Sequence, residues 1–163
     1  IEAGELTVAS ERFALTDAIV KVTGIVRPLA EKKGLSLIVD VAPNVDDMVG
    51  DTRRVEQVLL NLLSNAIDFS PEGGEIRLLA SAGNGSLTVE VIDQGPGVAA
   101  EDSERIFEPF VQGRRKASAP RQGSGVGLSI VRELVRALGG SVRLLPSAAG
   151  AHFSVELPDE KQQ

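Results

Sequence analysis

Residues 87–93 read Leu-Thr-Val-Glu-Val-Ile-Asp, and this stretch decides the class of fold. Apolar and polar side chains alternate along it, and successive side chains of a strand point to opposite faces of a sheet. Such a strand has one covered and one solvated face, whereas the strands of a doubly wound parallel sheet are apolar throughout. We therefore predict an α+β fold in which helices cover only one face of the sheet.

The same alternation recurs elsewhere in the chain, at residues 35–41, 76–80, 142–144 and 153–157. Apolar side chains at helical spacing fill three longer stretches, each followed by glycine or by a Ser-Pro pair that stops a helix. These predicted helices span residues 16–33, 51–69 and 126–138. The sequence thus predicts a two-layer α/β sandwich, with a mixed, mostly antiparallel sheet of about five strands and about three helices on one face.

Composition excludes several classes of protein. The 163 residues suit one domain, and the absence of cysteine rules out disulfides, thiolate zinc sites and a cysteine nucleophile. A net charge of −6 argues against a nucleic-acid partner. No apolar run reaches the roughly 20 residues of a membrane span, and no signal peptide opens the chain. Because the chain begins at Ile1 and not at Met, we expect a piece of a longer protein.

Asp93 is the first candidate for chemistry. Period-2 counting places it on the same face as Leu87, Val89 and Val91, so its carboxylate is directed toward the covered side of the sheet. A carboxylate that only accepts hydrogen bonds suits an exocyclic amine such as N6 of adenine. The following Gly95-Pro96-Gly97 would let backbone approach a ligand closely. The alternative is an aspartate that caps the following turn.

The second predicted helix carries a polar stripe. Asn61, Asn65 and Asp68 follow one another at i, i+4 and i+7, so they project from one side of the helix. Their oxygens are hard ligands of the kind that Mg²⁺ prefers. The alternative is a solvated helix face.

Residues 95–127 differ from the rest of the chain, because they hold six glycines and three prolines around the basic cluster Arg114-Arg115-Lys116. A loop this long inside a compact domain is usually functional, although the cluster alone is also typical of a solvated loop. The segment ends in Gly123-Ser124-Gly125-Val126-Gly127-Leu128, whose backbone N–H groups at a helix start favour phosphate. It is not a Walker A loop, because no Lys-Ser/Thr follows the glycines.

One motif matches a different class of protein. Residues 95–100 fit the GxGxxA fingerprint of dinucleotide-binding proteins. That fingerprint needs a following helix and an acidic residue about 20 positions further on, where this chain has its basic loop. We therefore reject a Rossmann-type site.

In their order along the chain, these motifs resemble the ATP-binding catalytic domain of sensor histidine kinases, in the wider group shared with gyrase, Hsp90 and the MutL proteins. Residues 51–66 look like the family's N box, and Asp93-Gln-Gly95-Pro-Gly97 looks like its first glycine box. Ile106-Phe107-Glu108-Pro109-Phe110 resembles the phenylalanine box, and residues 123–128 resemble the second glycine box. The likeness covers the whole chain, and four ordered motifs make it specific.

The resemblance implies Mg²⁺ and ATP as cofactors, with Asn61 and Asn65 as catalytic residues and Asn65 as the metal ligand. It also implies that residues 112–122 form a mobile lid. The residues that it assigns to the nucleotide are Asn61, Asn65, Asp68, Phe69, Asp93, Gly95, Gly97, Val98, Phe110, Arg114, Arg115, Lys116, Gly123, Ser124, Gly125, Val126, Gly127 and Leu128.

Three activities are compatible with such a site. The clamp-type ATPases of the group have a water-activating glutamate one turn before the metal-binding asparagine, whereas this chain has Asn61, and an amide takes up no proton. Transfer to an external acceptor is therefore favoured over hydrolysis. Asp68 stands where the family usually has a basic residue, and an acid near the phosphates repels ATP. A nucleotide-binding regulatory module with weak or no phosphotransfer is the alternative.

The phosphate acceptor is expected outside this chain. His152 is the one histidine of the sequence, and it occupies a strand beside Phe153, where a structural role is the ordinary one. The resemblance implies a histidine-bearing dimerisation and phosphotransfer domain before Ile1, and a response-regulator receiver domain as the next partner. It assigns residues 1–9 to the end of that preceding helix and linker, 10–158 to the catalytic domain, and 159–163 to a polar tail.

We expect this piece to be a monomer in the cytoplasm without membrane contact, whether or not its parent is anchored in the inner membrane.

Overall fold

The computed structural model describes residues 10–45, 47–108, 127–147 and 150–158. Within these ranges the helices are α1 (Leu15–Lys32), α2 (Thr52–Phe69), α3 (Gly127–Ala137) and the short 3₁₀ helices η1 (Ala100–Asp102) and η2 (Arg105–Phe107). The strands are β1 (Glu11–Ala14), β2 (Ser36–Val41), β3 (Asp47–Gly50), β4 (Glu75–Gly83), β5 (Ser86–Ile92), β6 (Ser141–Leu145) and β7 (His152–Pro158). The three predicted α-helices therefore exist, with ends within one residue of those predicted.

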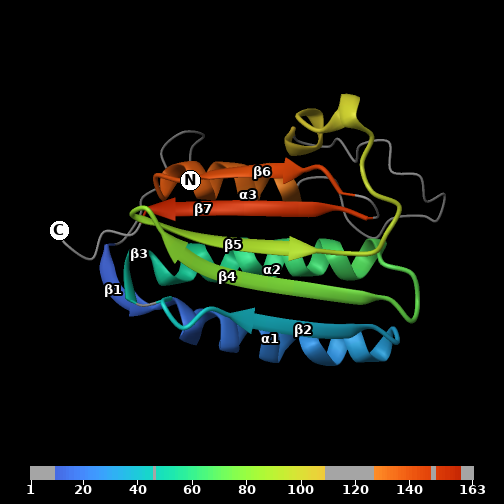
Figure 1. Cartoon of the computed structure of the whole chain (residues 1–163), viewed down its shortest axis with the longest axis horizontal. Helices are drawn as coiled ribbons and strands as arrows, with labels where there is room; N and C mark the ends of the chain where they lie inside the picture. Colours follow the sequence, from blue (N-terminus) through green and yellow to red (C-terminus); the bar gives the residue numbers. More distant parts are fainter. Residues whose placement is uncertain (1–9, 46, 109–126, 148–149, 159–163) are drawn as a thin grey trace.

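The main sheet has five strands in the order β2-β4-β5-β7-β6. Only β2 and β4 run parallel, because α2 and β3 lie between them in the chain, and the other neighbouring pairs are antiparallel. Figure 1 shows α1, α2 and α3 side by side behind this sheet, on the same face. The predicted two-layer architecture is confirmed.

The core lies between the sheet and the three helices. Leu87, Val89 and Val91 of β5 point into it and are at most 1% exposed, as the alternation predicts. On the helix side, α2 contributes a stripe of buried side chains: Val55, Val58, Leu59, Leu62, Leu63, Ala66 and Ile67. This packing fixes α2, and with it the polar stripe on its other side, relative to the end of β5.

The opposite face of the sheet carries the histidine. Phe153 is buried in the core, and its neighbour His152 points the other way, as predicted. There the ring Nε2 lies 2.5 Å from Oε1 of Glu90 on β5. His152 is thus separated from the helix layer by the sheet itself.

Two features were not predicted. β1 and β3 form an antiparallel pair, and their four-residue length is too short for alternation to reveal a strand in the sequence. The second feature is the pair of short 3₁₀ helices η1 and η2 within residues 100–107. Among the described residues, no helix combines the length and the apolar character that a membrane crossing requires.

Candidate functional site

Asp93 follows β5 directly and is buried, with 2% of its surface exposed. Its Oδ1 accepts hydrogen bonds from the backbone N–H groups of Gly95, at 2.8 Å, and Ala151, at 3.0 Å. Each hydrogen bond to a charged group is worth about 1.5–3 kcal/mol, which offsets the cost of burying the carboxylate. The aspartate therefore does cap the turn at Gly95, and this cap fixes the orientation of the buried carboxyl group.

Gly150 and Ala151, directly before β7, form the second wall around Asp93. Gly150 has a φ of 74°, and a side chain there would overlap the carbonyl oxygen of Asp93. Gly97, with a φ of 79°, approaches the carbonyl oxygen of Gly150, which would lie 3.1 Å from a Cβ at position 97. Sequence reasoning missed Gly150 and Ala151. The only local signal is a glycine just before the last strand, since the partner Asp93 lies 58 residues away.

Helix α2 is held firmly at both ends. At its start, Oδ1 of Asp51 accepts from the backbone N–H groups of Arg53 and Arg54, at 3.1 and 3.3 Å, as an N-cap. At its end, Nζ of Lys33 donates to the carbonyl oxygens of Ile67, at 2.6 Å, and Asp68, at 3.1 Å. Capped ends satisfy backbone groups that the helix itself leaves without partners. The polar stripe on α2 therefore projects from a rigid support.

The end of α2 meets the glycine loop after β5. A Cβ built on Gly95 would lie 2.5 Å from the carbonyl oxygen of Phe69 and 3.2 Å from Oδ1 of Asp93. Only a residue without a side chain fits between these oxygens. Two sequence motifs that are more than 20 residues apart, the one on α2 and the one around Asp93, are thereby brought together, as the interpretation of the sequence requires.

The side-chain amide of Asn65 has a buried nitrogen that makes no hydrogen bond to the described residues. Its Nδ2 is buried, and in the described part of the chain it is one of two buried side-chain polar atoms without a hydrogen bond; the other is Oγ of Ser70. Buried donors without partners are uncommon in folded proteins and call for a ligand or water. Asn61 lies one turn earlier on the same half-buried side of α2, and Asp68 is exposed. These donors and hard oxygens fit a metal–phosphate group.

The remaining predicted residues divide into two sets. Val98 and Leu128 are partly buried against the core, and Gly127 begins α3, which contacts η2. The other predicted positions lie outside the described residues: Phe110, Arg114, Arg115, Lys116, Gly123, Ser124, Gly125 and Val126, together with the expected lid at 112–122.

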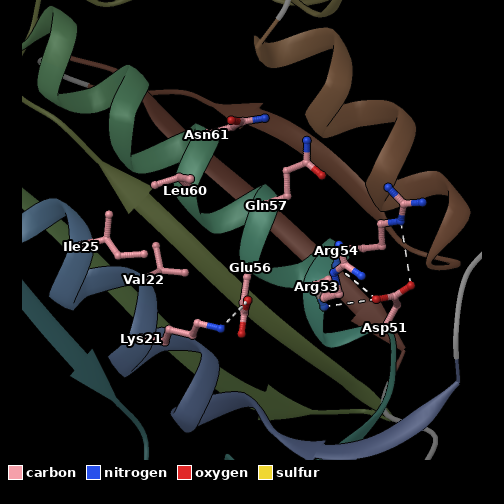
Figure 2. Close-up of a pocket in the computed structure, with 10 residues that line it drawn as sticks. All are labelled: Lys21, Val22, Ile25, Asp51, Arg53, Arg54, Glu56, Gln57, Leu60 and Asn61. Atoms are coloured by element: carbon pink, nitrogen blue, oxygen red, sulfur yellow. Dashed lines mark hydrogen bonds and ion pairs between the residues drawn. The ribbon is translucent and has the colours of Figure 1, made fainter.

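A separate pocket of about 710 Å³ opens between α1 and the first half of α2 (Figure 2). Lys21 of α1 and Glu56 of α2 form an ion pair across it at 3.4 Å, and Val22, Ile25 and Leu60 line its apolar part. It shares only Asn61 with the predicted nucleotide residues. This pocket is therefore not the candidate site, which lies around Asn65, Phe69, Asp93 and Gly95.

Comparison with known proteins agrees with this fold. Residues 50–161 match the family model described as histidine kinase-, DNA gyrase B-, and HSP90-like ATPase. The autoinducer 2 sensor kinase/phosphatase LuxQ of Vibrio harveyi is 36% identical over 166 residues, covering 97% of this chain and 19% of LuxQ. The chain therefore spans about a fifth of the length of that curated relative.

Solved structures of similar proteins have the same fold. Full-length ShkA in complex with AMPPNP superposes with a TM-score of 0.84 at 33% identity, covering 96% of this chain and 32% of ShkA. The catalytic domain of the histidine kinase ThkA gives 0.81 at 29% identity, covering 92% of this chain and 95% of that domain. ThkA has also been solved in complex with the response regulator protein TrrA, with a TM-score of 0.79 at 26% identity, covering 94% of this chain and 43% of that chain.

The fold and the matches together define an ATP-binding domain, and the chain belongs to the family of histidine kinase-, DNA gyrase B- and HSP90-like ATPases. Within that family it is the ATP-binding catalytic domain of the sensor histidine kinase type.

The contact between Gly95 and Phe69 leads to a prediction. Gly95→Ala places a methyl group 2.5 Å from the carbonyl oxygen of Phe69, so backbone must move, and we expect a loss of about 1–3 kcal/mol in the free energy of unfolding. Gly83→Ala is the control, because no atom lies within 4 Å of a Cβ there, and it should change stability by less than about 1 kcal/mol. Urea denaturation followed by circular dichroism measures both, and equal stabilities would contradict the assigned contact.

Proposed function

We propose that this domain binds Mg-ATP between α2, the loop after β5 and the start of α3, and transfers the γ-phosphate to a histidine on another domain of the parent protein. The observation that carries the proposal is the buried Asp93, oriented through Oδ1 by Gly95 and Ala151 beside the capped end of α2. The carboxylate of Asp93 is buried and held in one orientation, so it can accept a hydrogen bond from the amine of a base such as adenine. The neighbouring glycines have no side chains, so a flat base can lie close to their backbone.

The residues take the following roles in this proposal. Asp93 accepts a hydrogen bond from the adenine amine, and Gly95 and Gly97 let the base lie close to the backbone. Asn65 holds Mg²⁺ through its amide oxygen, and its unpartnered Nδ2 supports a phosphate or a metal-bound water at that position. Asn61 lies near the phosphates. Bound Mg²⁺ supplies charge neutralisation on the phosphates, and the protein supplies positioning.

Transfer is favoured over hydrolysis because the turn of α2 before Asn65 carries no base. Asn61 occupies the preceding turn, and an amide takes up no proton from water. In the transfer step, the bond between Pγ and the bridging oxygen breaks, and a bond from Pγ to an imidazole nitrogen forms. The bridging oxygen leaves with its electron pair as part of ADP, and the imidazole loses one proton.

A second function is favoured by one specific observation. Asp68 is exposed on the same side of α2 as Asn61 and Asn65, so it adds negative charge where a triphosphate would lie. A domain with weakened ATP affinity can act as a nucleotide-binding regulatory module without phosphotransfer.

The partners follow from the same proposal. The acceptor histidine belongs to a dimerisation and phosphotransfer domain of the parent protein, and a receiver domain takes the phosphate next. The complex of the relative ThkA with the response regulator protein TrrA supports a response regulator as a partner. We further propose that residues 1–9 belong to the end of the preceding helix and linker, 10–158 to the catalytic domain and 159–163 to a tail, and that the domain works as a cytoplasmic monomer.

The decisive experiment mixes the 163-residue chain and γ-labelled ATP with the histidine-bearing domain of its parent protein. Acid-labile label on that domain, lost when its histidine is replaced, supports the kinase. Binding of Mg-ATP without transfer supports the regulatory module, and rapid release of inorganic phosphate without labelled protein supports a hydrolase.

The adenine contact predicts the effect of Asp93→Asn. The variant keeps an oxygen for Gly95 and Ala151 but turns an amide donor toward the amine donor of the base, so we expect at least about 100-fold weaker Mg-ATP binding, or ~2.7 kcal/mol. His152→Ala is the control, because His152 lies on the other face of the sheet. Isothermal titration calorimetry measures both, and unchanged affinity in Asp93→Asn would refute the assignment of Asp93.

The charge of Asp68 predicts the effect of Asp68→Lys. Removal of an acid and addition of a cation near the phosphates should tighten Mg-ATP binding by about five- to tenfold, at the low end of the ~1–4 kcal/mol expected for charges about 4 Å apart in partly solvated surroundings. Asp40→Lys makes the same charge change at an exposed position of β2 and should leave the affinity unchanged. Weaker binding by Asp68→Lys would instead mean that Asp68 helps to hold the metal.

A further inference from the structure

Phe107, the last residue of η2, is held between the sheet and α3. Its ring is buried, with 3% exposed, and meets the ring of Phe153 on β7 edge to face, with centroids 6.0 Å apart and planes at 81°. The guanidinium carbon of Arg132 on α3 lies 5.7 Å from the centroid of the same ring. This distance is within the reach of about 6 Å of a cation–π interaction. One aromatic ring thus joins η2, β7 and α3.

The segment that carries Phe107 begins in the candidate site. It leaves β5 at Asp93 and passes through Gly95 and Gly97 before it forms η1 and η2. It is internally braced, because the buried carboxylate of Asp102 lies 3.9 Å from the guanidinium of Arg105, and the N–H of Glu108 donates to the carbonyl oxygen of Arg105 at 2.9 Å. The residues on either side of Phe107 are therefore held to one another by local contacts.

Helix α3 begins at Gly127, on the phosphate side of the proposed site, and Arg132 lies five residues further on. Val131, Leu134 and Val135 already bury α3 in the core. Arg132 differs from these apolar residues, because it places a planar cation over the ring of Phe107. A cation–π interaction has a preferred geometry, which apolar packing lacks. The contact between Arg132 and Phe107 therefore joins the two segments at one defined point.

We propose that Arg132 is a positioning residue for nucleotide binding, which through Phe107 holds the start of α3 in register with the segment that runs from Asp93 to η2. Arg132 touches neither the base nor the phosphates in this proposal. The inference rests on the proposed function, since it assigns the two segments to opposite ends of one nucleotide.

The test measures the affinity of the 163-residue chain for Mg-ATP by calorimetry, well below its unfolding temperature. Arg132→Met keeps the length of the side chain without the cation, and we expect about five- to tenfold weaker binding, within the range of a partly buried cation–π contact. Arg132→Lys restores a cation over the ring and should bind within about threefold of the unchanged chain. Arg136→Met, at an exposed position one turn further along α3, should leave the affinity unchanged.

A double-mutant cycle with Phe107→Leu tests whether the effect runs through the ring. Once Phe107 is replaced, Arg132→Met should weaken binding by less than about twofold. Additive losses would overturn the proposal, as would wild-type affinity in Arg132→Met or equal losses in Arg132→Met and Arg132→Lys. If Phe107→Leu does not fold, the series at position 132 decides the question alone.

Thermal unfolding without nucleotide separates positioning from stability. A lower melting temperature in Arg132→Met with unchanged affinity would overturn the proposal and leave Arg132 as a residue of the core. If the unchanged chain fails to bind Mg-ATP, the proposed function fails and this inference with it. If the unchanged chain binds and Arg132→Met binds equally well, only this inference fails.

Discussion

The candidate site is organised around one buried carboxylate. Asp93 has 2% of its surface exposed, and Oδ1 takes backbone hydrogen bonds from Gly95 on one side and Ala151 on the other. A buried carboxylate is tolerated only where such donors surround it. The loop after β5 and the β6–β7 connection are consequently fixed against each other, and the glycines at 95, 97 and 150 are the residues that allow this approach.

The single helix layer explains why the site forms where it does. All three α-helices pack on one face of the sheet, so α2 lies behind the end of β5 (Figure 1). The carbonyl oxygen of Phe69, the last residue of α2, approaches the loop at Gly95. Lys33 from the end of α1 donates to two of the neighbouring carbonyl groups. The site is therefore supported from the core outward, and its polar groups are presented by elements whose positions packing has already set.

The prediction of the fold succeeded where side-chain periodicity was long enough to measure. α2 and β5 were found because 18 and seven residues repeat a clear pattern, whereas the four residues of β1 and of β3 do not. The structure brings Asp93 and Gly95 to the end of α2, which carries the polar stripe, and their assignment to a nucleotide stays a prediction. Ala151 was missed, because it acts only through its backbone N–H group, and an N–H group has no signature in the sequence.

The sequence by itself determined the class of fold, the family and the chemistry of the candidate residues, because alternation, helical spacing and ordered motifs are local properties of the chain. It also separated His152 from the site, since period-2 counting places that ring opposite Phe153. Only the tertiary structure decided that Gly150 and Ala151 enclose Asp93, that Lys33 caps α2, and that Arg132 lies over Phe107. These contacts join residues 25 to 58 positions apart, and the packing of the helices on the sheet brings them together.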